Sequence, residues 1–184
     1  MRVVAGELKG RRLVSPPGAT TRSATERIRE SLFAMLEPDI ADARVLDLFA
    51  GGGSLGIEAL SRGAAHATFV ERDRNALVAL RANVVATGTG ERARVVAASV
   101  LAYLGGSTAG PFDLVFCDPP FADVEVLSAT LAHEGLRSSL APGALVVARV
   151  LRKHRPALPA GVRTERDKQI GEETLLFLRY DAAR

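Results

Sequence analysis

From residue 44 onward, short apolar runs alternate with segments in which apolar residues recur every three or four positions. The runs predict buried strands, and the helical recurrence predicts amphipathic helices. We therefore expect strands at residues 44–49, 66–71, 92–97 and 112–117, and helices at 54–63, 73–87, 99–104 and 123–134. Strands that alternate with helices indicate an α/β fold with a doubly wound, mainly parallel sheet covered on both faces.

The two ends of the chain carry a different pattern. Strands are expected at residues 143–150, 161–167 and 174–180, and no helix separates the last two, which predicts a C-terminal β-hairpin. Residues 2–14 show two short β-prone runs around Gly6 and Gly10, which predicts an N-terminal hairpin. Ser23 or Thr25 can cap a helix in which apolar residues recur, namely Ile28, Leu32, Phe33, Met35 and Leu36. We expect a basic N-terminal extension over residues 1–40 and one domain over residues 41–184.

A glycine-rich loop follows the first strand of the alternating region. Gly51, Gly53 and Gly56 have the spacing G-x-G-x-x-G, in which glycines permit a tight turn and close approach to a ligand. Asp47 lies four residues before the first glycine, and Glu71 ends the next apolar run. An acid about 20 residues after the loop can bind a ribose hydroxyl in a dinucleotide fold. The closely related S-adenosylmethionine fold has the same requirement, so this loop alone does not separate the two.

The second motif follows the strand at residues 112–117 and consists of Asp118, Pro119, Pro120 and Phe121. The two prolines fix φ and remove two backbone donors, which leaves a rigid rim rich in acceptors. Such a rim suits an amine substrate. The motif resembles the D/N-P-P-F/Y/W signature of methyltransferases that modify a planar amine, with Phe121 placed to stack on the ring that carries it.

Together with residues 22–33 and 47–64, this motif makes the chain resemble the RsmD family, over nearly its whole length. That family methylates N2 of a guanine, position 966, in bacterial 16S ribosomal RNA of the small subunit. The resemblance implies an S-adenosylmethionine-dependent enzyme whose partner is 16S rRNA within an assembling small subunit. This chain departs from the family pattern at three positions. Ser23 replaces a proline, Ser99 an aspartate or asparagine beside the adenine, and Arg149 an acid that often follows a strand.

The resemblance also implies a site. The cofactor residues are expected to be Asp47, Phe49, Gly51, Gly53, Glu71, Arg72, Ser99, Val100 and Asp118. Among these, Asp47 and the glycine loop would hold the methionine part, Glu71 both ribose hydroxyls, and the pair at 99 and 100 the adenine. Catalysis is expected to depend on Asp118, Pro119 and Phe121, with the first two accepting hydrogen bonds from the N2 hydrogens as charge develops.

Basic residues gather at the two ends of the chain. Residues 1–29 and residues 149–168 each hold seven Lys or Arg against two acids, so each segment carries +5 while the whole chain carries +3. Such segregation favours contact with a polyanion, although solvated surface arginines are the ordinary alternative. The candidate RNA-binding residues are Arg11, Arg12, Arg22, Arg27 and Arg29.

Several features narrow the class of protein. No apolar run approaches the roughly 20 residues that span a bilayer, and the start resembles no secretory signal, so a cytoplasmic monomer is expected. Cys117 lies in an apolar run and is expected to be a buried, inert thiol. The three histidines, His66, His133 and His154, lack the spacing of metal ligands, so no metal is expected.

Two other functions fit parts of the pattern. A DNA adenine-N6 or protein-glutamine methyltransferase uses a similar proline-containing motif, though usually with asparagine at the place of Asp118. A non-catalytic ribosome-assembly module that binds RNA could retain the same fold, because fold alone does not establish function.

Overall fold

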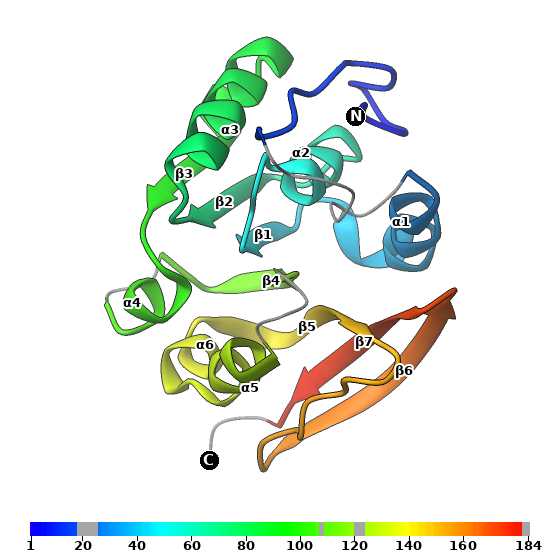
Figure 1. The fold of residues 1–184 in the computed structure, drawn as a ribbon, viewed down its shortest axis with the longest axis vertical. Helices are drawn as coiled ribbons and strands as arrows, with labels where there is room; N and C mark the ends of the chain where they lie inside the picture. The colour runs from blue at the N-terminus through cyan, green and yellow to red at the C-terminus, as the bar shows by residue number, and fades with distance from the viewer. Residues whose placement is uncertain (18–25, 107–108, 120–123, 182–184) are drawn as a thin grey trace.

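The computed structural model describes residues 1–17, 26–106, 109–119 and 124–181, and is centred on a seven-stranded sheet (Figure 1). The strands are β1 (Arg44–Leu48), β2 (His66–Glu71), β3 (Ala93–Ala97), β4 (Phe112–Cys117), β5 (Leu140–Leu151), β6 (Val162–Ile170) and β7 (Glu173–Tyr180). Their order across the sheet is β3-β2-β1-β4-β5-β7-β6. The first five strands are parallel, and β7 runs antiparallel to both β5 and β6. The predicted doubly wound sheet and C-terminal hairpin are confirmed.

Helices cover both faces of this sheet. They are α1 (Glu26–Ile40), α2 (Ser54–Ser61), α3 (Arg74–Thr87), α4 (Val100–Leu104), α5 (Val124–Ala132) and α6 (Glu134–Ser138). Alternate strand residues enter two separate cores, so that Val45 packs with α1, α2 and α3, whereas Leu46 packs with α4, α5 and α6. Among the helices of the described residues, none has the length and apolar character needed to cross a bilayer.

The structure corrects two boundaries. Strand β5 begins at Leu140 and not at residue 143. Its pairing with β4 shifts in register around Pro142 and Gly143, so the strand continues through these two residues as a local irregularity. Gly143 adopts φ 74°, which suits a residue without a side chain. A separate helix, α6, follows α5 where one helix was expected over residues 123–134. His133 caps α6 by accepting a hydrogen bond from the backbone nitrogen of Gly135.

Residues 2–14 fold back on themselves as predicted, but without two regular strands. An antiparallel bridge joins Arg2 and Arg12, and backbone hydrogen bonds join Val3 to Gly10 and Arg11, and Met1 to Leu13. The ladder does not extend further, because the nitrogens of Val4 and Ala5 donate to the Glu58 carboxylate of α2 at 2.8 and 2.9 Å. These part-buried bonds satisfy backbone groups that a longer hairpin would pair.

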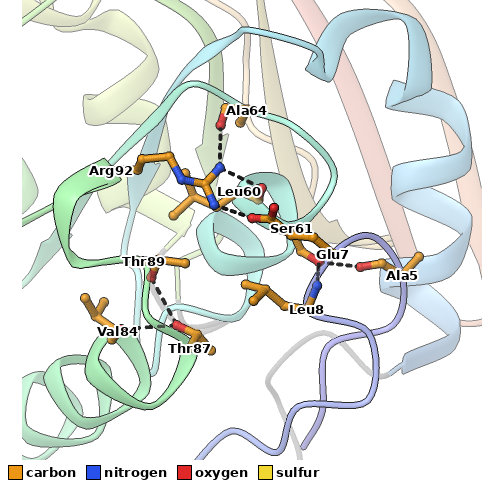
Figure 2. Close-up of polar contacts among 10 residues, drawn as sticks. All are labelled: Ala5, Glu7, Leu8, Leu60, Ser61, Ala64, Val84, Thr87, Thr89 and Arg92. Atoms are coloured by element: carbon orange, nitrogen blue, oxygen red, sulfur yellow. Dashed lines mark hydrogen bonds and ion pairs between the residues drawn. The ribbon is translucent and has the colours of Figure 1, made fainter.

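Figure 2 shows how the same segment is fastened near the C-terminal end of α2. The Ser61 hydroxyl donates to the Ala5 carbonyl and accepts from the Leu8 nitrogen, while Arg92 pairs with Glu7. Gly6 fits here because a Cβ at its position would lie 1.8 Å from the Ser61 carbonyl oxygen. Three apolar side chains of this segment, Val3, Leu8 and Leu13, enter the core shared with α1, α2 and α3.

Candidate functional site

The glycine loop and the proline motif meet at one edge of the sheet. Strands β1 and β4 are parallel neighbours, with Leu48 opposite Cys117, so their carboxyl ends lie side by side. The strand order reverses at this point, where ligands of open α/β sheets bind. A cavity of about 420 Å³ opens there. Its walls include these predicted site residues: Asp47, Phe49, Gly51, Glu71, Arg72, Ser99, Val100, Asp118 and Pro119.

The three glycines of the G-x-G-x-x-G pattern have different structural roles. Gly51 faces the cavity at φ 56°, and a Cβ at its position would meet no atom within 4 Å. Gly53, by contrast, does not line the cavity, and a Cβ there would lie 2.4 Å from Leu80. A Cβ on Gly56 would lie 2.3 Å from the Phe69 ring. Gly51 therefore offers backbone to a ligand, whereas the other two let α2 pack closely on α3 and β2.

Asp47 is buried at the end of β1, where its carboxylate accepts a hydrogen bond from the backbone nitrogen of Gly56 at 2.9 Å. Burial raises the pKa of Asp47 to about 8, and the neighbouring carboxylates of Asp118 and Glu71 add to that rise. The bond from Gly56 opposes it. A buried acid of this kind favours a cationic partner, which would restore its charge.

Glu71 organises the loop from the end of β2. One of its oxygens accepts from the Gly51 nitrogen at 2.7 Å, and the other accepts from the nitrogens of Arg72 and Asp73 at 2.7 and 2.8 Å. A carboxylate has about four acceptor positions. Three are therefore in use, and the rest of this carboxylate lines the cavity.

Ser99 and Val100 lie on the far wall, at the start of α4. The Ser99 hydroxyl accepts from the Ala102 nitrogen at 3.3 Å and caps the helix, so its hydrogen-bonding capacity is partly used within the protein. Val70, Val100 and Leu101 form the wall beside it. This part of the cavity is apolar and suits a flat aromatic group.

Asp118, after β4, also lines the cavity and makes a two-point ion pair with Arg149. Burial raises the pKa of Asp118, and the guanidinium opposes that shift. Arg149 itself is buried, so it does not belong to the basic surface that the charge of residues 149–168 predicted. Pro119 is buried in the wall, whereas Phe121 lies outside the described residues. The thiol of Cys117 is buried, as expected.

The basic candidates separate into exposed and buried residues. Arg11, Arg12 and Arg27 are exposed, and Arg22 lies outside the described residues. The expectation that Arg29 binds RNA is wrong, because its side chain is 1% exposed and donates to the Arg2 carbonyl at 2.8 Å. Its position on α1, four residues before Phe33, places it on the apolar face of the helix.

Residues that the sequence did not indicate also line the cavity. They include Met1, Ser15 and Pro16 of the N-terminal segment, and Val126 and Arg149. No local pattern in residues 1–16 points to a ligand, because their place in the wall depends on contacts with distant helices. Arg149 had a weaker signal, since it stands where the family pattern has an acid.

Comparison with known proteins extends over this whole architecture. A family model described as conserved hypothetical protein 95 matches residues 1–179. The chain is 38% identical over 173 residues to Ribosomal RNA small subunit methyltransferase D of Escherichia coli (strain K12), covering 94% of this chain and 86% of that protein. The protein of the same name from Haemophilus influenzae is 41% identical over 123 residues, which cover 66% of this chain and 64% of the relative.

The solved structures agree with this similarity. The Escherichia coli protein yhhF superimposes with a TM-score of 0.86 at 35% identity, and the match covers 100% of this chain and 99% of that one. The similarity therefore includes the N-terminal segment as well as the sheet.

Proposed function

Since this chain belongs to the RsmD family of ribosomal RNA methyltransferases, we propose that it transfers a methyl group from S-adenosylmethionine to N2 of a guanine in small-subunit ribosomal RNA. The observation that supports this most directly is the meeting of the glycine loop, Glu71 and Asp118 around one cavity. A cofactor held by the first two would place its reactive end beside the third.

The residues around the cavity fit S-adenosylmethionine. The buried Asp47 would receive the cationic amino group of the methionine part, which would lower the pKa of this acid again. Gly51 leaves room for close approach of a ligand to the backbone. Glu71 retains about one acceptor position for a ribose hydroxyl, and Val100 contributes to an apolar slot for adenine. Phe49, Arg72 and Ser99 complete the proposed cofactor site.

Guanine N2 is a weak nucleophile, because its lone pair is delocalised into the ring. Acceptors for both N2 hydrogens favour pyramidal nitrogen and stabilise the positive charge that develops there. We assign this role to the Asp118 carboxylate and the Pro119 carbonyl, both at the end of β4. When bound, S-adenosylmethionine supplies an electrophilic methyl group, so the protein needs no nucleophilic side chain. Phe121 remains the predicted stacking partner of the base.

The proposed RNA contacts are electrostatic. Arg11, Arg12 and Arg27 are exposed in the N-terminal part of the chain, and residues of the same segment, Met1 and Ser15, line the cavity. A base that leaves its stack to reach Asp118 would bring its phosphates toward this segment.

A transfer assay tests the proposal. The purified chain is incubated with labelled S-adenosylmethionine and either naked 16S rRNA or a small-subunit precursor particle, and the RNA is digested to nucleosides. Label in N2-methylguanosine supports the assignment, and the difference between the two RNAs identifies the assembly state that is recognised. Asp118→Ala is the matched inactive control.

The same experiment separates the alternatives. Parallel reactions with DNA and with protein acceptors would yield N6-methyladenine or methylglutamine if the proline motif served those substrates. Label in either product, with none in guanosine, would reject the proposed target. Absence of label in every acceptor, in a folded protein that binds S-adenosylmethionine, would favour the non-catalytic assembly module.

A further inference from the structure

Three charged side chains form a compact cluster beside the cavity, whose wall includes Asp118 and Arg149. Nε and Nη2 of Arg149 donate to the two oxygens of Asp118 at 2.7 and 3.0 Å. Nη1 of the same guanidinium donates to both oxygens of Glu173 at 3.2 and 3.1 Å. The side chains of Arg149, Asp118 and Glu173 are 7%, 13% and 19% exposed, so this pairing is only slightly screened by solvent.

The register of the sheet explains why these residues meet. Cys117 of β4 lies opposite Ala148 of the parallel strand β5. The residues that follow, Asp118 and Arg149, therefore lie side by side. On the other side, Arg149 lies opposite Leu175 of β7, and Glu173 is two residues along that strand. Side chains two residues apart on a strand share a face, so Glu173 is the diagonal neighbour of Arg149.

The charges of the cluster make its arrangement specific. Arginine stays protonated at any pH in which the protein is folded, and its planar fork fits a carboxylate at two points. Each Asp118 oxygen gives one acceptor position to Arg149 and retains another. Two carboxylates around one guanidinium leave a net charge of −1, so the cluster remains attractive to a developing positive charge.

We propose that Arg149 is a positioning residue for methyl transfer: it fixes both oxygens of Asp118 toward the substrate amine, and Glu173 fixes Arg149. This inference rests on the proposed function, because it assigns to Arg149 the orientation of the acceptor that receives the N2 hydrogens.

The contacts of Arg149 with Asp118 and Glu173, called the clamp below, also influence the pKa of Asp118. The charged groups near Asp118 are Arg149 of β5, Glu173 of β7 and Asp47 of β1; the Cys117 thiol points to the opposite face of the sheet. Only Arg149 lowers the pKa of Asp118, whereas burial and Glu173 raise it. Removal of the guanidinium would raise this pKa further, so the carboxylate would be protonated at a higher pH and would accept one hydrogen bond fewer.

The test compares Arg149→Met and Arg149→Lys with the unaltered protein over about pH 6 to 9. For Arg149→Met we expect kcat to fall about 10- to 100-fold, the effect of a displaced catalytic group, while KM for S-adenosylmethionine changes less than about threefold. The acid limb of the kcat profile should move to higher pH. Arg149→Lys should recover the position of that limb but only part of kcat, because an ammonium restores the charge and not the two-point geometry.

Arg179→Met is the control. This replacement removes the ion pair between Arg179 and Glu165 at the other end of β7. Arg179 is about 20 Å from Glu173 along the strand, given a rise of about 3.3 Å per residue. Its kcat and pH profile should match those of the unaltered protein. An unchanged kcat and acid limb in Arg149→Met, or an equal loss in Arg179→Met, would overturn the proposal.

Two further measurements keep the test decisive. If Arg149→Met fails to fold, Glu173→Gln removes one partner of Arg149 and should also lower kcat, but it should move the acid limb to lower pH, because the Glu173 charge that raises the pKa of Asp118 is gone. If no acceptor RNA is methylated even by the unaltered protein, the proposed function fails, but the clamp is still measured. In carboxyl-labelled aspartate NMR, assigned with Asp118→Asn, the Asp118 signal should titrate at a higher pH in Arg149→Met and at a lower pH in Glu173→Gln. An unmoved titration in a folded variant would overturn the clamp alone.

Discussion

Asn83 accepts a hydrogen bond from the backbone nitrogen of Val14 at 2.7 Å and donates one back to the Val14 carbonyl at 2.9 Å. The same amide also donates to the Gly52 carbonyl at 2.8 Å. The fully buried Asn83 side chain of α3 thus joins the N-terminal segment to the glycine loop. The place of Ser15 and Pro16 in the cavity wall depends on this connection.

Replacement of Asn83 by leucine should therefore affect stability and binding together. The backbone groups of Val14 and Gly52 would lose their partners, and we expect the free energy of unfolding to fall by about 1 to 3 kcal/mol. Affinity for S-adenosylmethionine should fall as well. Urea denaturation and calorimetry measure the two effects. Val85→Ala, on the exposed face of the same helix, should change neither, and a fully stable Asn83→Leu would contradict the role of this connection.

Glu71 should contribute to cofactor affinity through the loop as well as through direct contact. Glu71→Ala removes the acceptor of the Gly51, Arg72 and Asp73 nitrogens, so we expect S-adenosylmethionine binding to weaken by about 1 to 3 kcal/mol. Calorimetry on the folded variant measures this loss, with the exposed Glu91→Ala as control. Unchanged affinity would remove Glu71 from the cofactor site.

Asp118 should act in transfer and not in cofactor capture. Asp118→Asn keeps the shape of the side chain but replaces one acceptor oxygen with a donor, which would oppose an N2 hydrogen. We expect kcat to fall about 100-fold or more, on the scale of a lost transition-state hydrogen bond, while cofactor affinity stays within a few-fold. Single-turnover kinetics and calorimetry separate the two quantities. Collapse of cofactor affinity in a folded variant would assign Asp118 to binding.

Asp47 should make the stability of the ligand-free protein depend on pH. Its pKa is raised to about 8 in the folded protein, against 3.8 for an ordinary aspartate, so the folded state retains a proton that the unfolded chain releases. Its contribution to stability is therefore complete below about pH 4 and is lost as pH rises to about 8. Asp47→Asn cannot release that proton. Urea denaturation at about pH 5 and pH 8 should show a smaller loss of stability in the variant, and an equal loss would contradict the assignment.

Exposed arginines of the N-terminal segment should bind RNA phosphate. Arg11→Ala and Arg12→Ala should each lower affinity for 16S rRNA and reduce the salt slope by about one. Filter binding over a range of salt concentrations measures both quantities. Arg94→Ala, exposed on the edge strand β3, is the control and should keep the full slope.

Single replacements are preferable to truncation here. Residues 1–13 contribute Val3, Leu8 and Leu13 to the core and Met1 to the cavity wall, so their removal would disturb more than RNA contact. An RNA affinity that is independent of salt and unchanged by Arg11→Ala or Arg12→Ala would reject the electrostatic account.

The sequence by itself determined the layered α/β fold and the meeting of the two motifs. The apolar runs have the period of strands, and the carboxyl ends of β1 and β4 must lie at one edge of a parallel sheet. This local pattern was enough to place Asp47, Glu71 and Asp118 around a common cavity, because all three lie at the carboxyl ends of strands of one parallel sheet.

Only the tertiary structure decided what depends on contacts between distant segments. Residues 2–14 pair only in part, because Glu58 and Ser61 of α2 take the backbone bonds of Val4, Ala5 and Leu8. Arg29 and Arg149 are alike in sequence to surface arginines, and only packing shows that both are buried. A charge count gives only the number of arginines. Whether a guanidinium is buried depends on the strand register or helix face that brings carbonyl or carboxylate partners within hydrogen-bonding distance.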